Sequence, residues 1–218
     1  FKAYLKLRHF INNFKPDVVH SHMVHANLLA RLLTLTVKIP KLVCTAHNAN
    51  EGGKFRMLGY RLTDKLATIS TNVSDEAVES FIKKGAVKPG RMVSVVNGIN
   101  TNHFVFDAKL SYEKRQELEI TNQQAILSVG RLDIQKDYPN LLNAIAILKD
   151  QRQDFKVFIV GDGPLKQELL ELTKNLEIES CVEFLGIRRD IPALMSASDI
   201  FVLASAWEGF GLVIAEAM

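Results

Sequence analysis

The sequence predicts an α/β protein made of two lobes, each a parallel sheet flanked by helices. Short apolar runs alternate with helical patterns along almost the whole 218-residue chain, which is typical of βαβ units. The alternation stops over residues 101–121, where the chain is polar. The balance of charge also changes near this connector. Residues 1–106 carry 15 Lys or Arg and 6 Asp or Glu, whereas residues 107–218 carry 12 Lys or Arg and 18 Asp or Glu. We therefore expect two lobes, 1–106 and 107–218, with different partners.

The first half contains four strand-like runs, preceded by an amphipathic helix. The strands are expected over residues 17–21, 42–45, 66–70 and 92–96. The helices between them are expected over residues 24–37, 54–63 and 74–84, and Ser74 or Asn72 caps the last of these. Asn97 and Gly98 then form a turn. Leucines recur on or near one face of the helix over 24–37, namely Leu28, Leu29, Leu32, Leu33 and Leu35.

The second half repeats the pattern after the polar connector, which holds a short helix. Strands are expected over residues 125–129, 155–160, 182–185 and 200–204. Helices are expected over residues 139–150, from 164 to about 176, over 191–197, and after 211. In such a fold a ligand lies beyond the carboxyl ends of the strands, where turns and helix N-termini gather.

Composition places the chain among ordinary folded proteins. It is 47% hydrophobic and 23% charged, which excludes disorder and collagen-like repeats. No run approaches the roughly 20 apolar residues of a membrane span. Cys44 and Cys181 stand far apart inside apolar runs, so we expect reduced, buried thiols in a cytoplasmic protein. Both ends of the chain fall inside helical patterns, and we expect a fragment cut at both ends.

Glycine turns end the strands of the second half. Glycine lets the backbone approach a ligand closely, and a helix that follows offers N–H groups to an anion. Neither the dinucleotide-binding glycine pattern nor a P-loop occurs, so the four turns together indicate a nucleotide site of another kind. The turns are Gly130-Arg131, Gly161-Asp162-Gly163, Gly186 and Gly209-Phe210-Gly211.

Charged residues flank these turns. Arg131 follows the first turn and Lys136 precedes the next helix; an arginine fork and a lysine point charge together fit a diphosphate. Two exposed loop cations are the alternative. Glu208 and Glu216 stand on either side of the last turn. Carboxylates repel phosphate and accept hydrogen bonds from the hydroxyl groups of a sugar or ribose. The alternative is an acid without a binding role, placed at the start of a helix because the helix dipole favours it there.

The order and spacing of these motifs closely resemble the retaining glycosyltransferases of the GT-B fold, glycosyltransferase family 4. The matching segments of the second half are VGRLDIQKD at 129–137, VGDGP at 160–164, VEFLG at 182–186, SDIFVLAS at 198–205 and EGFGLVIAEAM at 208–218. The last segment contains that family's Glu-x7-Glu motif. The acceptor lobe of the family is similar to PDVVHSH at 16–22, TAHN at 45–48 and VVNGIN at 95–100. The resemblance covers nearly the whole chain and implies two Rossmann-like lobes, both incomplete in this chain.

The resemblance also implies roles for the matching residues. Arg131 and Lys136 resemble the pair that holds the donor diphosphate and supports the departing phosphate. Glu208 resembles the residue that binds the donor sugar, Glu216 the acid that binds the ribose, and His47 the histidine that reaches the sugar from the acceptor lobe. The donor-binding backbone is implied at Gly130, Ile187, Arg188, Gly209, Phe210 and Gly211.

The reaction implied is a hexosyl transfer from a UDP- or GDP-sugar to an acceptor sugar or lipid-linked saccharide, in bacterial surface polysaccharide or glycolipid assembly. No Asp-x-Asp metal motif occurs, so we expect Arg131 and Lys136 to replace a divalent ion and expect no cofactor. The basic first lobe suggests contact with an anionic membrane surface at the inner face of the cell membrane, or with a phosphorylated substrate. An ordinary solvated basic surface is the alternative. No nucleic acid partner is expected. The family's frequent glycine after the lysine is Asp137 here.

Several histidines of the first half stand near strand ends. His20 and His22 are two residues apart on a strand and share a face. Zinc is not expected, because structural sites usually bring closely spaced cysteines and a catalytic site needs a third ligand. We expect His22 and His25 to line the acceptor pocket, with Gly98 nearby, and His20 to pack beside the strand. Ordinary hydrogen-bonded histidines are the alternative.

Two other functions use the same two-lobed architecture. One is a nucleotide-sugar epimerase or a phosphorylase; no pyridoxal-phosphate lysine is evident, and epimerases lack this Glu-x7-Glu setting. The other is a catalytically inactive nucleotide-sugar-binding module. The intact set of Arg131, Lys136, Glu208 and Glu216 argues against inactivity.

Overall fold

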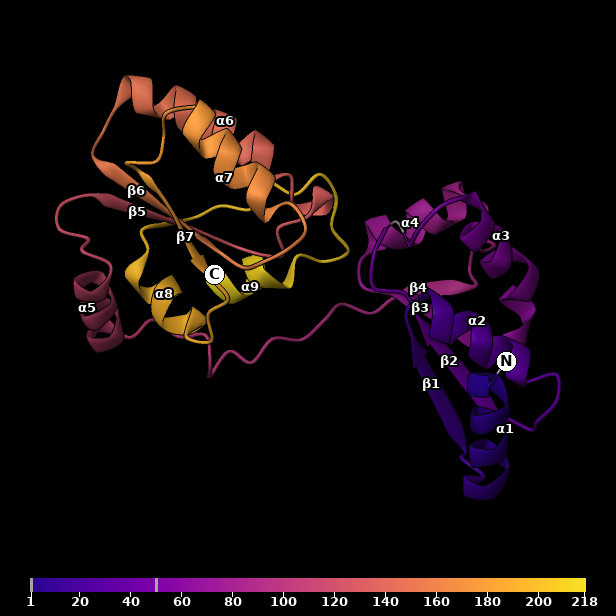
Figure 1. The fold of residues 1–218 in the computed structure, drawn as a ribbon. Helices are drawn as coiled ribbons and strands as arrows, with labels where there is room; N and C mark the ends of the chain where they lie inside the picture. Colours follow the sequence, from indigo (N-terminus) through magenta and orange to yellow (C-terminus); the bar gives the residue numbers. More distant parts are fainter. Residues whose placement is uncertain (1, 50) are drawn as a thin grey trace. The chain divides into compact units, whose positions relative to one another are not determined.

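The computed structural model describes residues 2–49 and 51–218. The chain divides into two compact units (Figure 1). The first holds residues up to Gly98 together with Glu208–Phe210, and the second holds Ile99–Trp207 and Gly211–Met218. Each unit contains one four-stranded parallel sheet with helices packed on it. The predicted α/β class with two parallel sheets is confirmed.

The first unit has its strands in chain order. They are β1 (Val18–His22), β2 (Lys41–Thr45), β3 (Ile69–Asn72) and β4 (Met92–Ser94), and the sheet order is β1-β2-β3-β4. The helices are α1 (Lys2–Phe14), α2 (Val24–Leu33), α3 (Lys54–Thr63) and α4 (Asp75–Lys83), with a 3-10 turn at Asp64–Leu66. Every crossover advances in the same direction, so right-handed connections place the helices on one face (Figure 1). The described residues leave Val18, Ile69 and Val93 exposed on the other face.

The second unit reverses its strand order once. Its strands are β5 (Gln124–Val129), β6 (Phe155–Val160), β7 (Val182–Gly186) and β8 (Ile200–Phe201), in the order β7-β6-β5-β8. Its helices are α5 (Ala108–Glu117), α6 (Tyr138–Gln151), α7 (Lys166–Asn175), α8 (Ile191–Ala197) and α9 (Leu212–Ala217), with a 3-10 turn at Ile134–Lys136. The chain moves from β5 outward to β7 and then returns to the far side of β5. The switch point between β5 and β8 is where ligands of such sheets bind.

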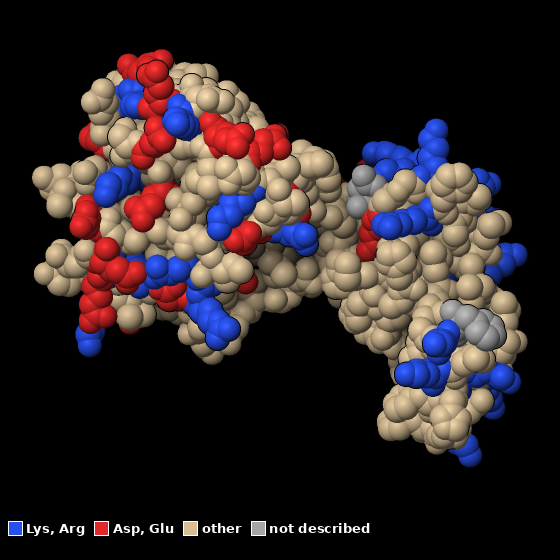
Figure 2. All heavy atoms as spheres, viewed as in Figure 1, with Lys and Arg blue, Asp and Glu red and all other residues tan. Residues whose placement is uncertain are grey.

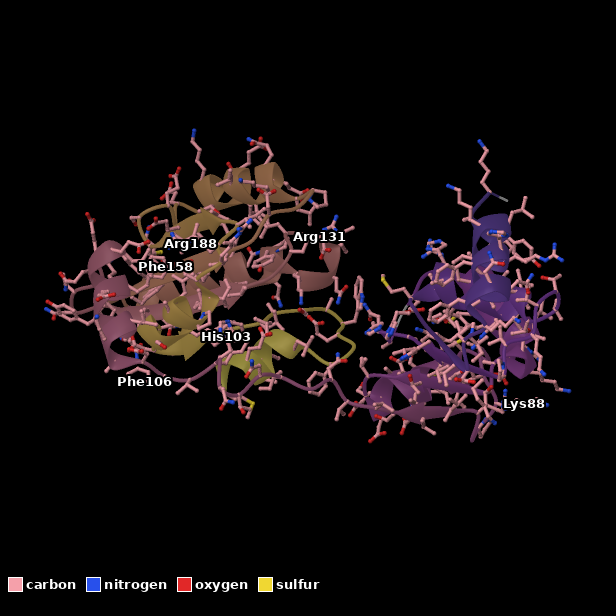
Figure 3. The ribbon with its side chains drawn as sticks, turned by 90° about the horizontal axis from the view of Figure 1, so that it is seen from below. Lys88, His103, Phe106, Arg131, Phe158 and Arg188 are labelled. Atoms are coloured by element: carbon pink, nitrogen blue, oxygen red, sulfur yellow. The ribbon has the colours of Figure 1, made fainter. Side chains whose placement is uncertain are left out.

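Both faces of the second sheet are covered, which explains its continuous apolar strands. Val157 and Ile159 of β6 pack with α6 and α7, whereas Phe158 and Val160 pack with Leu194 of α8. Figure 1 shows α6 and α7 on one face and α5 and α8 on the other, and Figure 3 labels Phe158 in the sheet. Alternate side chains of one strand therefore enter two separate apolar layers.

Four expectations from the sequence differ from the structure. The helix expected over 24–37 ends at Leu33, and Leu32 and Leu35 are exposed. The strand expected over 66–70 begins only at Ile69, because Leu66 belongs to the 3-10 turn. Asp64 of that turn is buried and pairs with Arg91 at 3.2 Å. The strands expected over 92–96 and 200–204 pair only over Met92–Ser94 and Ile200–Phe201.

The boundary between the units falls after Gly98, not near residue 106. The connector packs on the second unit, because Phe104–Phe106 line a cavity with Pro192 and Met195. The Asp107 N–H also donates to Ser196 Oγ at 3.2 Å. These contacts group the connector with the helices that follow it.

Charge follows the two units on the face that Figure 2 shows. There the first unit displays mainly Lys and Arg, whereas the second mixes both signs. Both cysteines are free thiols, Cys44 buried and Cys181 half-buried. Within the described ranges, no helix has the length and apolar character needed to cross a membrane.

Candidate functional site

Glycine turns join the carboxyl ends of three neighbouring strands in the second unit. The Gly130 N–H donates to the Val160 carbonyl at 2.9 Å, and the Gly161 N–H donates to the Gly186 carbonyl at 2.8 Å. Gly161 has a φ of +140°, and a Cβ built there would stand 1.9 Å from the Gly130 carbonyl oxygen. A side chain at position 161 therefore meets backbone, and only glycine fits.

The two predicted cations lie on the loop after β5. Lys136 extends across Gly130, because a Cβ on that glycine would lie 3.2 Å from Lys136 Cε. The Arg131 side chain is 72% exposed, with Nε 3.6 Å from Asp133 Oδ2, and Figure 3 labels it at the edge of the second unit. Both cations thus stand beside the strand end at the switch point.

Buried residues hold this loop in place. Tyr138 is almost fully buried and donates its hydroxyl to the Gly130 carbonyl at 3.3 Å. Burial raises the pKa of Tyr138 to about 12, so the hydroxyl stays a neutral donor. Asp137 adopts a left-handed conformation with φ +47° and ψ +44°, which favours glycine. Asp137 therefore takes a conformation that glycine, the residue expected here from the family's pattern, adopts without strain.

The segment after β8 runs beside the cation loop. The Val202 N–H donates to the Leu127 carbonyl at 2.8 Å, and the Ala206 N–H donates to the Gln135 carbonyl at 2.9 Å. The switch point thus brings two segments, about seventy residues apart in the chain, to the same end of the sheet.

Glu208, Gly209 and Phe210 group with the first unit instead of the second, where the sequence had assigned them. The reason is close packing, because a Cβ on Gly209 would lie 2.1 Å from the His47 carbonyl oxygen. Glu208 lines a cavity of about 420 Å³ that Asp75 and Glu76 also line. A cavity with three carboxylates suits hydroxyl groups and repels phosphate.

The second glutamate of the motif lies elsewhere. Gly211 is left-handed, with a φ of +71°, and begins α9, which carries Glu216. Glu216 lines the cavity of about 260 Å³ that Phe104–Phe106 also line. The structure therefore places Glu208 and Glu216 in two different cavities, and the ribose role expected for Glu216 stays a prediction.

Arg188 belongs to an ion-pair cluster between α5 and the start of α8. Its Nη2 lies 2.6 Å from Asp190 Oδ2 and 2.7 Å from Glu117 Oε1, and Lys114 pairs with the same two acids. The hydrogen bond from Arg188 lowers the pKa of Asp190. The side chain of Arg188 is therefore structural, and Figure 3 shows it apart from Arg131. The base-binding backbone expected at Ile187, which is 78% exposed, and at Arg188 stays a prediction.

Three histidines meet at the carboxyl ends of β1 and β2. His22 Nδ1 lies 2.8 Å from His47 Nε2, and the His20 and His22 rings are in contact, with centroids 4.1 Å apart and planes tilted by 37°. His20 Nε2 lies 2.7 Å from Thr45 Oγ1, so His20 joins the row instead of packing aside. Because successive side chains of a strand point to opposite faces, His20 and His22 lie together on the sheet face that carries no helix. His25, in the first turn of α2, and Gly98, at the end of the first unit, are both exposed.

The pattern of the sequence did not reveal the residues that anchor His47. Glu51 Oε1 accepts from the His47 N–H at 3.1 Å, and Glu51 Oε2 accepts from the Tyr60 hydroxyl at 2.5 Å. Buried Asn27 donates to that hydroxyl at 3.0 Å and to the Thr45 carbonyl at 2.9 Å. In the sequence, the polar Asn27 between Ala26 and Leu28 was a signal that could have indicated this buried network. Among the described residues, no group of three or more His, Cys, Asp or Glu side chains is placed to hold a metal ion.

His20 and His47 are expected to titrate at a lower pH than an ordinary histidine. Burial, with the charge of His22 next, lowers the pKa of both His20 and His47 below 6.5. The unfolded chain then binds more protons than the folded one, so the first unit loses stability as pH falls below 6.5. NMR titration should place both midpoints below 6.5, and His22→Gln should raise both. Midpoints above that value would contradict the arrangement.

Glu51 is expected to stabilise the His47 loop. Glu51→Ala removes two charge-assisted hydrogen bonds, and we expect a loss of about 2 kcal/mol in the free energy of unfolding, measured by denaturant titration. Glu79→Ala is the matched control, because Glu79 is exposed and, among the residues that the structure describes, pairs only with Lys83; it should cost less than about 0.5 kcal/mol. Equal losses in the two variants would show that Glu51 anchors nothing.

Two family models match adjoining parts of the chain. One, described as Glycosyltransferase Family 4, matches residues 1–103, and the other, described as Glycosyl transferases group 1, matches residues 111–218. Together they span almost every residue. The chain belongs to glycosyltransferase family 4. The resemblance read from its motifs is thereby confirmed.

Two bacterial relatives of this glycosyltransferase are named as sugar transferases. It is 29% identical over 99% of its length to the UDP-Gal:alpha-D-GlcNAc-diphosphoundecaprenol alpha-1,3-galactosyltransferase of Escherichia coli, covering 59% of that protein. It is 29% identical over 100% of its length to an alpha-1,4-N-acetyl-D-galactosaminyltransferase of Campylobacter jejuni, named for a diphosphoundecaprenol-linked acceptor, covering 57% of it.

A solved structure has the same fold. The crystal structure of Anabaena Alr3699/HepE in complex with UDP-glucose matches with a TM-score of 0.88 and 24% identity, over 98% of this glycosyltransferase and 60% of that chain. The GT-B architecture expected from the motifs is confirmed. The glycosyltransferase chain spans about three fifths of the length of these relatives.

Proposed function

We propose that this glycosyltransferase moves a sugar, with retention and without a metal ion, from a nucleotide-sugar to a lipid-linked saccharide. The observation that carries the proposal is the pair of cations at the switch point of the second sheet. Lys136 lies across Gly130, and Arg131 projects from the same strand end. The relatives described above are named as transferases, which favours transfer over the epimerase and over an inactive binding module.

The cations of the second unit suit the diphosphate of a nucleotide-sugar. When the bond from the anomeric carbon to the diphosphate breaks, negative charge develops on the leaving oxygen. Fixed cations aimed at that oxygen stabilise the transition state, because they need no reorganisation during the reaction. Arg131 and Lys136 supply these cations. The carboxylates of Glu208, Asp75 and Glu76 repel phosphate and accept hydrogen bonds from sugar hydroxyls.

The choice of donor and acceptor follows the relatives. The Escherichia coli relative is named for a UDP-sugar donor and a diphosphoundecaprenol-linked acceptor, and it aligns with 99% of this chain. We therefore propose a uridine donor and an acceptor carried on a lipid diphosphate. Such an acceptor lies in a membrane, so the enzyme works at the inner face of the cell membrane in surface glycan assembly.

Titration calorimetry on two glutamate variants tests the donor site. If Glu216 binds the ribose, Glu216→Gln should weaken UDP and the intact UDP-sugar alike, by about tenfold to a hundredfold. If Glu208 binds only the sugar, Glu208→Gln should leave UDP affinity nearly unchanged while transfer falls. Equal losses of UDP affinity in both variants would refute this division of roles.

Transfer assays test the reaction itself. The enzyme should transfer a radiolabelled sugar from a UDP-sugar in the presence of excess EDTA, and the product should keep the anomeric configuration of the donor. Complete loss of activity on chelation, restored by magnesium or manganese, would defeat the metal-free proposal.

A further inference from the structure

The ion-pair cluster between α5 and the start of α8 is closed on itself. Arg188 binds Asp190 in a two-pronged contact, with 2.8 Å from Nε to Oδ1 and 2.6 Å from Nη2 to Oδ2. Arg188 Nη2 also lies 2.7 Å from Oε1 of Glu117, the last residue of α5. Lys114 Nζ lies 2.7 Å from Asp190 Oδ2 and pairs with Glu117 as well. Each cation therefore contacts both acids, and the four charges sum to zero.

Partial burial strengthens this cluster. The Lys114 side chain is 13% exposed and that of Arg188 25%, so salt screens these pairs less than pairs at an open surface. A network of charges also stabilises more than an isolated surface ion pair does. The hydrogen bond from Lys114 lowers the pKa of Glu117, and the one from Arg188 lowers the pKa of Asp190. Both acids therefore stay charged at neutral pH.

The loop that carries Arg188 is fixed on all sides. At its start, the Gly186 carbonyl accepts from the Gly161 N–H at 2.8 Å. At its end it enters α8, which lies beside α5 on the same face of the sheet (Figure 1). Arg115 of α5 also holds the far end of α8, because its Nη1 donates to the Ala197 carbonyl at 2.8 Å. The cluster closes the remaining side, so the loop cannot shift without breaking ion pairs.

Ile187 presents its backbone groups within this fixed loop. It is 78% exposed, and within the described residues its N–H and C=O groups form no hydrogen bond. Gly186 before it is bound to the sheet, and Arg188 after it, labelled in Figure 3, is held by the cluster. One donor and one acceptor are thus open to a ligand and are held between two fixed neighbours.

We propose that the ion-pair cluster positions the Ile187 backbone so that it selects the base of the donor nucleotide. The inference rests on the proposed function, in which the donor is a uridine nucleotide. The four side chains of the cluster are positioning residues, because they act on the base only through Ile187.

The chemistry of the bases explains why a fixed loop can select. Uracil presents N3–H beside a carbonyl oxygen, whereas cytosine, a base of the same size, presents an unprotonated N3 beside an amino group. The ribose and diphosphate fix the place of the ring, so a fixed N–H and C=O pair matches only one of these edges. A loop that could shift by one hydrogen-bonding position would match either edge.

Nucleotide binding by Glu117→Gln tests the proposal. In titration calorimetry the parent protein should prefer UDP over CDP by about tenfold or more, because the wrong edge leaves two polar groups unpaired. Glu117 is 46% exposed, so its replacement removes one charge of the cluster without opening the core. The preference for UDP should then fall to about threefold or less. An unchanged ratio of UDP to CDP affinity in this variant would overturn the proposal.

NMR relaxation of the free protein gives a readout that needs no nucleotide. The backbone amides of Ile187 and Arg188 should be rigid in the parent, with order parameters near about 0.85, and mobile in Glu117→Gln, with values below about 0.6. Amides that are mobile in the parent, or equally rigid in both proteins, would show that the cluster does not hold the loop. A parent protein that bound neither UDP nor CDP would contradict the proposed function, whereas the relaxation data would still decide the role of the cluster.

Two control variants lie on the same helix. Glu113→Gln removes a carboxylate that pairs with Lys109 at 3.8 Å, outside the cluster, and should change neither the affinity ratio nor the relaxation. Arg115→Gln releases the far end of α8 and should lower the melting temperature while the ratio stays as in the parent. If the ratio fell as much in Arg115→Gln as in Glu117→Gln, general loss of stability would account for the effect and the positioning role would be wrong.

Discussion

Replacing Lys136 or Arg131 by Ala is expected to slow sugar transfer about a hundredfold or more while the fold stays intact. In the proposed function each cation faces the departing diphosphate, and an oriented charge there is worth about 3 kcal/mol in the transition state. Lys136 lies across Gly130 and is half-buried, whereas the Arg131 side chain is 72% exposed. Neither side chain belongs to the apolar core, so the loss should appear in kcat and not in stability.

Steady-state kinetics with a UDP-sugar provides the measurement. Arg131→Lys should recover only part of the rate, because a lysine keeps the charge but not the planar fork. Lys109→Ala removes an equal charge from exposed α5, where Lys109 pairs with Glu113 at 3.8 Å, and should leave the rate unchanged. A Lys136→Ala rate within threefold of the parent would remove the cation pair from the mechanism.

Gly161→Ala is expected to unfold or severely destabilise the second unit. The added methyl would stand 1.9 Å from the Gly130 carbonyl oxygen, and the residue would have to keep a φ of +140°. Backbone strain of roughly 1–3 kcal/mol and overpacking of roughly 1–3 kcal/mol together predict a loss of about 4 kcal/mol. The single tryptophan, Trp207, lies in the second unit, and its fluorescence in denaturant reports the change.

Gly186→Ala is the graded control for this prediction. Gly186 also has a positive φ, +67°, but a Cβ there would meet nothing within 4 Å. Only the left-handed backbone is then penalised, at about 1 kcal/mol. If both variants lost the same stability, the close approach of Gly161 to Gly130 would not be what requires glycine at position 161.

The strands of the second unit are easier to predict than those of the first. The run over 155–160 matches β6 residue for residue, because both faces of the strand are buried and every position except Lys156 is apolar. The run over 66–70 fails, since the polar Ser70, Thr71 and Asn72 pair in β3 while Leu66 ends a 3-10 turn. In this segment, hydrogen bonding of the backbone to the neighbouring strands decides where the strand lies, and the apolar pattern of residues 66–70 does not.

The amino-acid sequence alone predicts the family, the two parallel sheets and the cations beside the strand-ending glycines. These features depend on local order along the chain, such as apolar runs, turns and residues a few positions apart. The histidine row, the Glu51 anchor of His47 and the different cavities of Glu208 and Glu216 emerge only in the folded chain. Parallel crossovers bring together residues that are far apart in sequence, and side chains that meet in this way share no periodicity that a sequence pattern could display.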